Sequence, residues 1–142
     1  MSEFSISSHD FNEGEEIPKK FGYKFENQQP QIDFKNILDG TKTIALIMDD
    51  PDAMGAVGKV WVHWLEYHYV NDITTIIQGK NDFGETGYGG PAPPDKRHTY
   101  IFKVYALDTV LELKEGYSKQ ELEDAMKGHI IAEAKLTGTF AP

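Results

Sequence analysis

Side chains that could do chemistry gather between Met48 and His63, where the chain reads MDDPDAMGAVGKVWVH. Asp50 and Asp52 flank Pro51 directly after an apolar run, and His63 follows among aromatic and branched residues. A carboxylate beside a histidine raises the pKa of the ring and fixes its tautomer. Polar groups at the end of a buried strand are costly unless they are paired. The stretch therefore predicts a site.

A second candidate segment runs from Gln78 to His98 and is rich in glycine and proline. Segments without periodicity that exceed about 12–15 residues inside a compact domain are usually functional or disordered. Glycine lets backbone N–H groups approach an anion closely, and such concavities bind phosphate without side-chain charge. If the strands that carry Asp50 and His63 pair with the strand after His98, all these groups converge at one end of a sheet.

Each residue taken alone has an ordinary structural explanation. A histidine on a strand face is more often a satisfied core residue than a ligand, and aspartates around a proline usually form a turn. A metal site built from His63, His98 and an aspartate has suitable ligand types, but the chain has no close spacing such as H-E-x-x-H. A serine triad is disfavoured because no serine lies between Ser8 and Ser118.

Composition restricts the function further. The chain has 142 residues, 39% of them hydrophobic, which predicts one domain over residues 1–142. A formal net charge of −9 argues against nucleic acid as a partner. The chain has no cysteine and no apolar run long enough for a transmembrane segment. Met1 to Ser5 lacks the pattern of a secretory signal, so a cytoplasmic location is the default expectation.

The elements that would position the site are mostly strands. The apolar run Thr43 to Met48 predicts a central strand, and Val60 to Val70 alternates so that His63 and Leu65 share one face. Similar patterns predict strands at 4–8, 21–25, 32–34, 73–77, 99–107 and 132–140. A capping box at Ser118 begins one helix that ends near Gly128. The fold class expected is mainly β, an antiparallel Greek-key β-sandwich with one or two peripheral helices.

Four motifs in order then carry a family resemblance: D-P-D-A from Asp50, V-H-W around His63, G-Y-G-G-P-A-P-P from Gly87 and H-T-Y from His98. Together they resemble the phosphatidylethanolamine-binding protein family, also named the Raf kinase inhibitor protein family. The end of the chain resembles its short bacterial and archaeal branch. Thr99 stands where the family often has an arginine, so one anion donor that the resemblance implies is missing here.

The resemblance implies a small pocket for phosphate-like anions, including a phosphorylated head group, and no catalytic residue, metal or cofactor. It implies seven ligand-binding residues: Asp50, Asp52, His63, Tyr88, Gly90, His98 and Tyr100. In this hypothesis the histidines, a tyrosine hydroxyl and the Gly90 backbone donate to the anion, while the aspartates orient the donors. The family also implies modulation, such as inhibition, of a protease or kinase, and a homodimer. The alternative hypothesis is a metal-dependent or Asp–His phosphoester hydrolase.

Overall fold

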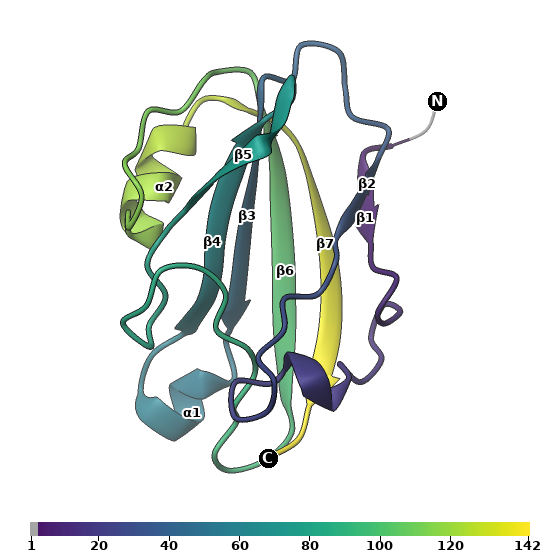
Figure 1. Ribbon diagram of the computed structural model, residues 1–142, viewed down its shortest axis with the longest axis vertical. Helices are drawn as coiled ribbons and strands as arrows, with labels where there is room; N and C mark the ends of the chain where they lie inside the picture. The colour runs from purple at the N-terminus through teal and green to yellow at the C-terminus, as the bar shows by residue number, and fades with distance from the viewer. Residues whose placement is uncertain (1–2) are drawn as a thin grey trace.

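The computed structural model describes residues 3–142, which form a five-stranded and a two-stranded antiparallel sheet (Figure 1). Met1 and Ser2, the first residues of the stretch that lacks a secretory-signal pattern, lie outside the described residues. The strands are β1 (Ser5–Ser7), β2 (Asp33–Lys35), β3 (Thr43–Asp50), β4 (Trp61–Tyr69), β5 (Asp72–Gln78), β6 (His98–Leu107) and β7 (Ile130–Phe140). The helices are the 3-10 helix η1 (Lys19–Phe21), α1 (Ala53–Val57) and α2 (Lys119–Met126).

The large sheet has the strand order β5-β4-β3-β6-β7. β3, β4 and β5 follow one another as antiparallel neighbours, and β6 then returns to lie on the other side of β3. This connection is a Greek key. Every residue of β3 is buried, as its apolar sequence predicts for a central strand. The predicted mainly β, antiparallel fold is therefore confirmed.

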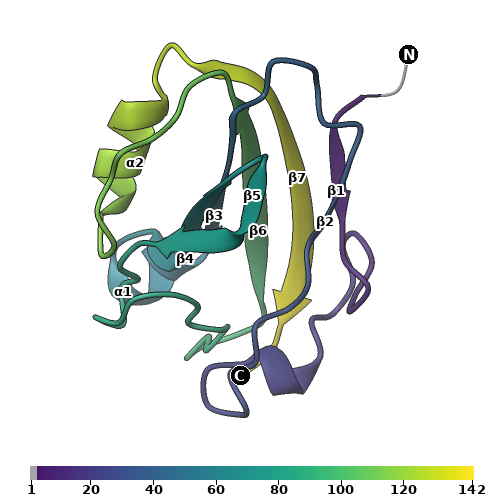
Figure 2. The same ribbon diagram turned by 45° about the horizontal axis from the view of Figure 1, so that its top comes forward.

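The two faces of the large sheet are covered differently (Figures 1 and 2). Leu122 and Met126 of α2 pack on one face, against Ala45 and Leu65 among others. The small β1–β2 sheet and the N-terminal segment cover the opposite face, where Trp64 lies in the core. The protein is thus a sandwich of two unequal sheets with a helix on its outer side.

Helix α2 begins at the predicted capping box. The Ser118 side chain accepts from the Glu121 backbone N–H, and the Glu121 carboxylate accepts from the Ser118 N–H. The buried Asp49 carboxylate fixes the helix to the sheet, because its Oδ2 lies 3.0 Å from the Nζ atoms of both Lys103 on β6 and Lys119 on α2.

The prediction of a strand at 21–25 is wrong. Phe21 ends the 3-10 helix η1 and the next residues form turns. Phe21 is fully buried in the core. The backbone N–H of Tyr23 donates a hydrogen bond to the Pro91 carbonyl. The aromatic residues here have separate roles: Phe21 is buried, Tyr23 stacks on Phe83 with 3.8 Å between ring centroids, and Phe25 is 54% exposed, so none of them reflects pairing in a sheet.

The predicted face of His63 is also wrong. Met48 pairs with Trp64 and Asp49 with Val62, so His63 is an extra residue on β4 without a partner in β3. Such a β-bulge interrupts the alternation and redirects side chains. His63 consequently contacts the ring of Tyr100, whereas Leu65 packs in the cluster beneath α2.

Candidate functional site

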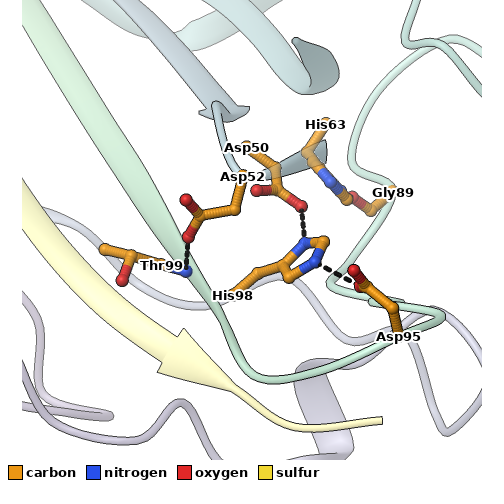
Figure 3. Close-up of polar contacts among 7 residues, drawn as sticks. All are labelled: Asp50, Asp52, His63, Gly89, Asp95, His98 and Thr99. Carbon is orange, nitrogen blue, oxygen red and sulfur yellow. Dashed lines mark hydrogen bonds and ion pairs between the residues drawn. The ribbon is translucent and has the colours of Figure 1, made fainter. Parts of the chain in front are cut away.

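Three strand ends meet at one end of the large sheet and bring candidate residues together (Figure 3). β3 ends at Asp50, which pairs with Trp61 at the start of β4, and the antiparallel β6 begins at His98. The convergence expected from the sequence therefore places Asp50, His63 and His98 around one space.

This space is a cavity of about 120 Å³, which we name the Trp61 cavity. Helix α1 supplies one part of its wall, the loop between β5 and β6 supplies another, and strand residues supply the polar groups. The lining includes Asp50, Ala53, Val57, Trp61, His63, Phe83, Ala92, Pro94, His98 and Tyr100. The cavity is mostly apolar with a few polar groups, as is usual for sites of small ligands.

Three side-chain atoms of this lining have no hydrogen-bond partner within residues 3–142, although all are fully buried. They are Asp50 Oδ1, Trp61 Nε1 and Tyr100 OH. Most buried polar atoms in folded proteins are paired, and an unpaired one costs about 1–3 kcal/mol. An acceptor and two potential donors left unpaired around one cavity indicate a ligand with matching groups.

His98 is held at both ring nitrogens by carboxylates. Its Nδ1 lies 2.6 Å from Asp50 Oδ2 and its Nε2 lies 2.6 Å from Asp95 Oδ1 (Figure 3). Burial disfavours the charged ring, but the bonds to Asp50 and Asp95 outweigh it and raise the pKa of His98. With a carboxylate oxygen at each nitrogen, the protonated ring donates both of its N–H groups to carboxylates. His98 has no N–H left for a ligand, contrary to the role expected from the sequence.

His63 takes the opposite protonation state. Its Nδ1 lies 2.7 Å from the Gly89 carbonyl oxygen, and a carbonyl only accepts, so the proton sits on Nδ1. Burial lowers the pKa of His63 more than this bond and the nearby Asp50 raise it. The ring is neutral with an acceptor at Nε2, so it does not offer the second N–H that the sequence hypothesis required.

Tyr100 keeps its proton and can donate it. Burial is the main cause that raises the pKa of its hydroxyl, and the neighbouring Asp50 carboxylate adds to the effect. Its ring lies edge-on to His63, with centroids 5.1 Å apart.

Three other predicted site residues support the surroundings and do not line the Trp61 cavity. Asp52 Oδ2 accepts from the Thr99 backbone N–H at 2.9 Å and so joins the start of α1 to β6. Gly90 donates its N–H to Asn27 Oδ1 at 2.8 Å, so this donor is already used. Tyr88 donates its hydroxyl to the Phe21 carbonyl at 2.8 Å.

Gly90 is required by packing. A Cβ atom at Gly90 would lie 1.9 Å from the Phe21 carbonyl oxygen, which is main chain and cannot move aside. Tyr88 packs edge-on against Trp64, 5.3 Å between centroids. The contacts of Gly90 and Tyr88 with Phe21 hold the loop between β5 and β6, which we name the glycine-proline loop, against the segment that carries η1.

Sequence reasoning missed Trp61, Phe83 and Asp95 as site residues. Asp95 lies three residues before His98, and that spacing was the one local signal that could have identified it. Trp61 and Phe83 carry no signal of their own, because an aromatic residue in a strand or loop usually belongs to the core. Within residues 3–142, no group of three or more histidine, aspartate or glutamate side chains is arranged to hold a metal ion, and no helix is long and apolar enough to cross a membrane.

Comparison with known proteins finds relatives that match nearly the whole chain. The sequence profile of the family described as phosphatidylethanolamine-binding protein matches residues 7–141. A UPF0098 protein from Methanothermobacter thermautotrophicus is 39% identical over 150 residues, and the match covers 96% of this chain and 97% of that protein. A UPF0098 protein from Chlamydia trachomatis is 38% identical, with 95% and 97% covered.

Two solved structures share the fold. CT736 from Chlamydia trachomatis, a homolog of phosphatidylethanolamine-binding protein, superposes with a TM-score of 0.89 at 36% identity, covering 98% of this chain and 97% of that one. YbcL from E. coli, described as a member of the mammalian family of this name, gives a TM-score of 0.85 at 29% identity, covering 98% of each chain.

Proposed function

Since the chain belongs to the phosphatidylethanolamine-binding protein family, we propose that it is a non-catalytic binding protein whose Trp61 cavity takes a phosphate-like anion or a phosphorylated head group. The observation that carries this proposal is the set of unpaired buried atoms at Asp50, Trp61 and Tyr100. The indole N–H and the phenol O–H can donate to phosphate oxygens. Asp50 Oδ1 needs a donor, and the P–OH group of a singly charged phosphate supplies one.

The charges around the cavity favour that singly charged form. Asp50 and Asp95 together carry two negative charges against one positive charge on His98, so a dianion would meet net repulsion. A monoanion brings one charge less and contributes the proton that Asp50 accepts. The Asp50–His98–Asp95 arrangement thus selects a protonation state of the ligand, rather than attracting anions in general.

Phosphoethanolamine, inorganic phosphate and sulfate test this proposal together. We expect phosphoethanolamine and phosphate to shift the Trp61 indole N–H signal in NMR spectra at pH 5.5. Binding should weaken at pH 8, where a phosphate monoester is mostly a dianion because its second pKa is about 6. Sulfate, of similar shape but without the proton, should bind weakly at both pH values. An unmoved Trp61 signal, or sulfate binding as well as phosphate, would refute the proposal.

Tyr100→Phe removes one hydroxyl that makes no hydrogen bond of normal geometry within residues 3–142, although the Asp50 carboxylate is its neighbour. A hydrogen bond to a charged group contributes about 1.5–3 kcal/mol, so phosphate affinity should fall by roughly ten- to a hundredfold. Tyr105→Phe is the matched control, since Tyr105 packs on the α2 side of the sheet. Equal affinities in the two variants would contradict the role of Tyr100.

The alternative hydrolase hypothesis is restricted by the site geometry. His98 has no free nitrogen to act as a base, so a general base in this cavity would have to be His63 at Nε2. Modulation of a protease or kinase, a homodimer and a cytoplasmic location stay predictions from the family and the sequence. Inhibition assays, sedimentation and cell fractionation would test them.

A further inference from the structure

A second, larger cavity of about 320 Å³ lies on the same face of the sheet as Trp64, and we name it the Trp64 cavity. It lies between strands β3 to β5 and the segment 29–37 that contains β2. Its volume falls within the roughly 300–1,000 Å³ of small-molecule sites. The lining includes Pro30, Ile32, Phe34, Ile37, Ile44, Leu46, Trp64, Glu66, His68, Val70, Ile73 and Ile76.

Glu66 is a buried carboxyl group, with 8% of the residue exposed, in a mostly apolar lining whose other polar residues are Gln29, Gln31 and His68. Both hydrogen bonds that it accepts from residues 3–142 end on Oε1, from Trp64 Nε1 at 2.9 Å and from Gln78 Nε2 at 3.5 Å. Its Oε2 accepts none from the described chain. Oε2 is not fully enclosed by the described chain, so it can be reached from the cavity and can accept a hydrogen bond from a bound molecule.

The lining supplies no positive charge to meet Glu66. Glu66 and His68 are its titratable residues, and no lysine or arginine lies among them. Burial lowers the pKa of His68, so its ring is neutral. Phe34 lies against that ring, 5.7 Å between centroids, which leaves the imidazole in apolar surroundings. A countercharge for the ionised form of Glu66 would therefore come with a ligand.

We propose that the Trp64 cavity binds a primary aliphatic ammonium compound, with the ammonium group on Glu66 Oε2 and the alkyl chain along the apolar wall. An ammonium group is compact and has three donors, so one can reach Oε2 while others remain for water or nearby carbonyls. A neutral alcohol would supply the hydrogen bond without the charge. A quaternary ammonium would supply the charge without an N–H.

The mouth of the cavity suits the alkyl chain. Ile73, Ile76 and Ile37 line it while remaining 69%, 43% and 39% exposed, respectively. A chain that leaves the buried end at Glu66 would cover these side chains and remove them from water, which is favourable in proportion to the apolar area covered.

The two tryptophans allow a test that separates this cavity from the phosphate proposal. The Trp64 indole N–H donates to Glu66 and reports on this cavity, whereas the Trp61 indole lines the other one. We expect octylammonium to shift the Trp64 indole signal in NMR spectra of the full chain and to leave that of Trp61 in place. Trp61→Phe assigns the two signals. A shift of Trp61 alone would overturn the proposal.

Charge and chain length provide two further tests. Glu66→Gln should weaken octylammonium binding at least tenfold and leave 1-octanol binding unchanged, because only the ammonium uses the carboxylate charge. In the unaltered protein, affinity should rise about three- to fourfold for each methylene from butylammonium to octylammonium. Equal octylammonium affinity with and without Glu66, or no dependence on chain length, would refute the proposal. Self-association that excludes the ligand, detected by sedimentation, would instead assign the cavity mouth to a second copy of the chain.

Discussion

The two cavities each combine a tryptophan, a histidine and a buried carboxyl group, but the carboxyl group has a cationic partner in one cavity and none in the other. In the Trp61 cavity Asp50 lies 2.6 Å from His98, and this contact helps to raise the pKa of the histidine. In the Trp64 cavity no cation meets Glu66, and burial raises the pKa of that carboxyl to about 7. The difference teaches that pairing, rather than burial alone, decides which buried groups of this protein are charged.

Removal of Asp50 should have the largest effect, because it leaves the buried imidazolium of His98 without its main partner. Loss of one member of a buried ion pair costs about 3–5 kcal/mol. We therefore expect Asp50→Asn to lower the free energy of unfolding by about that amount in urea titrations at pH 6.

Asp95→Asn is the matched control for Asp50→Asn. The Asp95 side chain is 42% exposed, so water can replace its contact with His98 and the loss should be much smaller. Equal losses in the two variants would contradict the view that the buried Asp50–His98 pair dominates this cavity.

The loop between β5 and β6 supplies part of the wall of the Trp61 cavity and packs closely at Gly90, and Gly90→Ala tests how rigidly this loop is held. The added methyl group would collide with the Phe21 carbonyl oxygen, and overpacking typically costs about 1–3 kcal/mol. We expect a loss near 3 kcal/mol in thermal or urea unfolding. Gly55→Ala in α1 is the control, because a Cβ there meets nothing within 4 Å. If the Gly90 variant is as stable as the Gly55 variant, the loop is free to move.

Glu66 should make stability depend on pH in the other cavity. Its pKa rises from 4.5 in the unfolded chain to about 7 in the folded protein, so the folded state binds more protons between these values. Stability should fall as pH rises from about 4.5 through 7, by about 3 kcal/mol in total. Glu66→Gln should remove this slope while other groups continue to titrate. A variant with the slope of the parent protein would show that Glu66 is ionised without cost.

Histidine titrations followed by NMR should show the smallest effect, and they compare the pKa values of His98 and His63 directly. The pKa of His98 should lie above 6.5 and that of His63 below it. The stability from protonated His98 is complete below pH 6.5 and is lost as pH rises through its higher folded pKa. For His63 the sign is reversed, and stability falls as pH drops below 6.5. Asp95→Asn should lower the pKa of His98. An unchanged pKa would show that Asp95 does not stabilise the protonated ring.

Much of the fold could be predicted because its signals are local. The apolar run at 43–48 encodes burial on both faces, and the Ser118 capping box encodes the start of α2. The prediction of a strand at 21–25 was wrong because alternating aromatic residues do not by themselves show that a segment forms the hydrogen bonds of a sheet. The five-residue helix α1 was missed because it is too short for a periodic pattern and contains Gly55.

The site was predicted less completely because its chemistry depends on contacts that the sequence does not contain. The bulge at His63 depends on how β4 pairs with β3. The proton on His98 depends on Asp50, 48 residues away, and on Asp95. The glycine-proline loop was predicted to offer backbone donors, but Asn27 already binds the Gly90 N–H. Residue types identified the region, and only the fold assigned the donors and acceptors.

The N-terminal segment has a consequence for how copies of this chain can associate. Gly14 and Ile17 donate backbone N–H groups to Thr137 and Thr139 of β7, and Thr139 donates back to Glu15. The outer edge of β7 is thereby paired with the chain itself at Thr137 and Thr139, while β5 ends the sheet on the other side with Ile73 exposed. Unpaired strand edges are templates for aggregation. Strand addition is therefore blocked at the C-terminal part of the β7 edge, and truncation before Ile17 would expose that part as the β5 edge is already exposed.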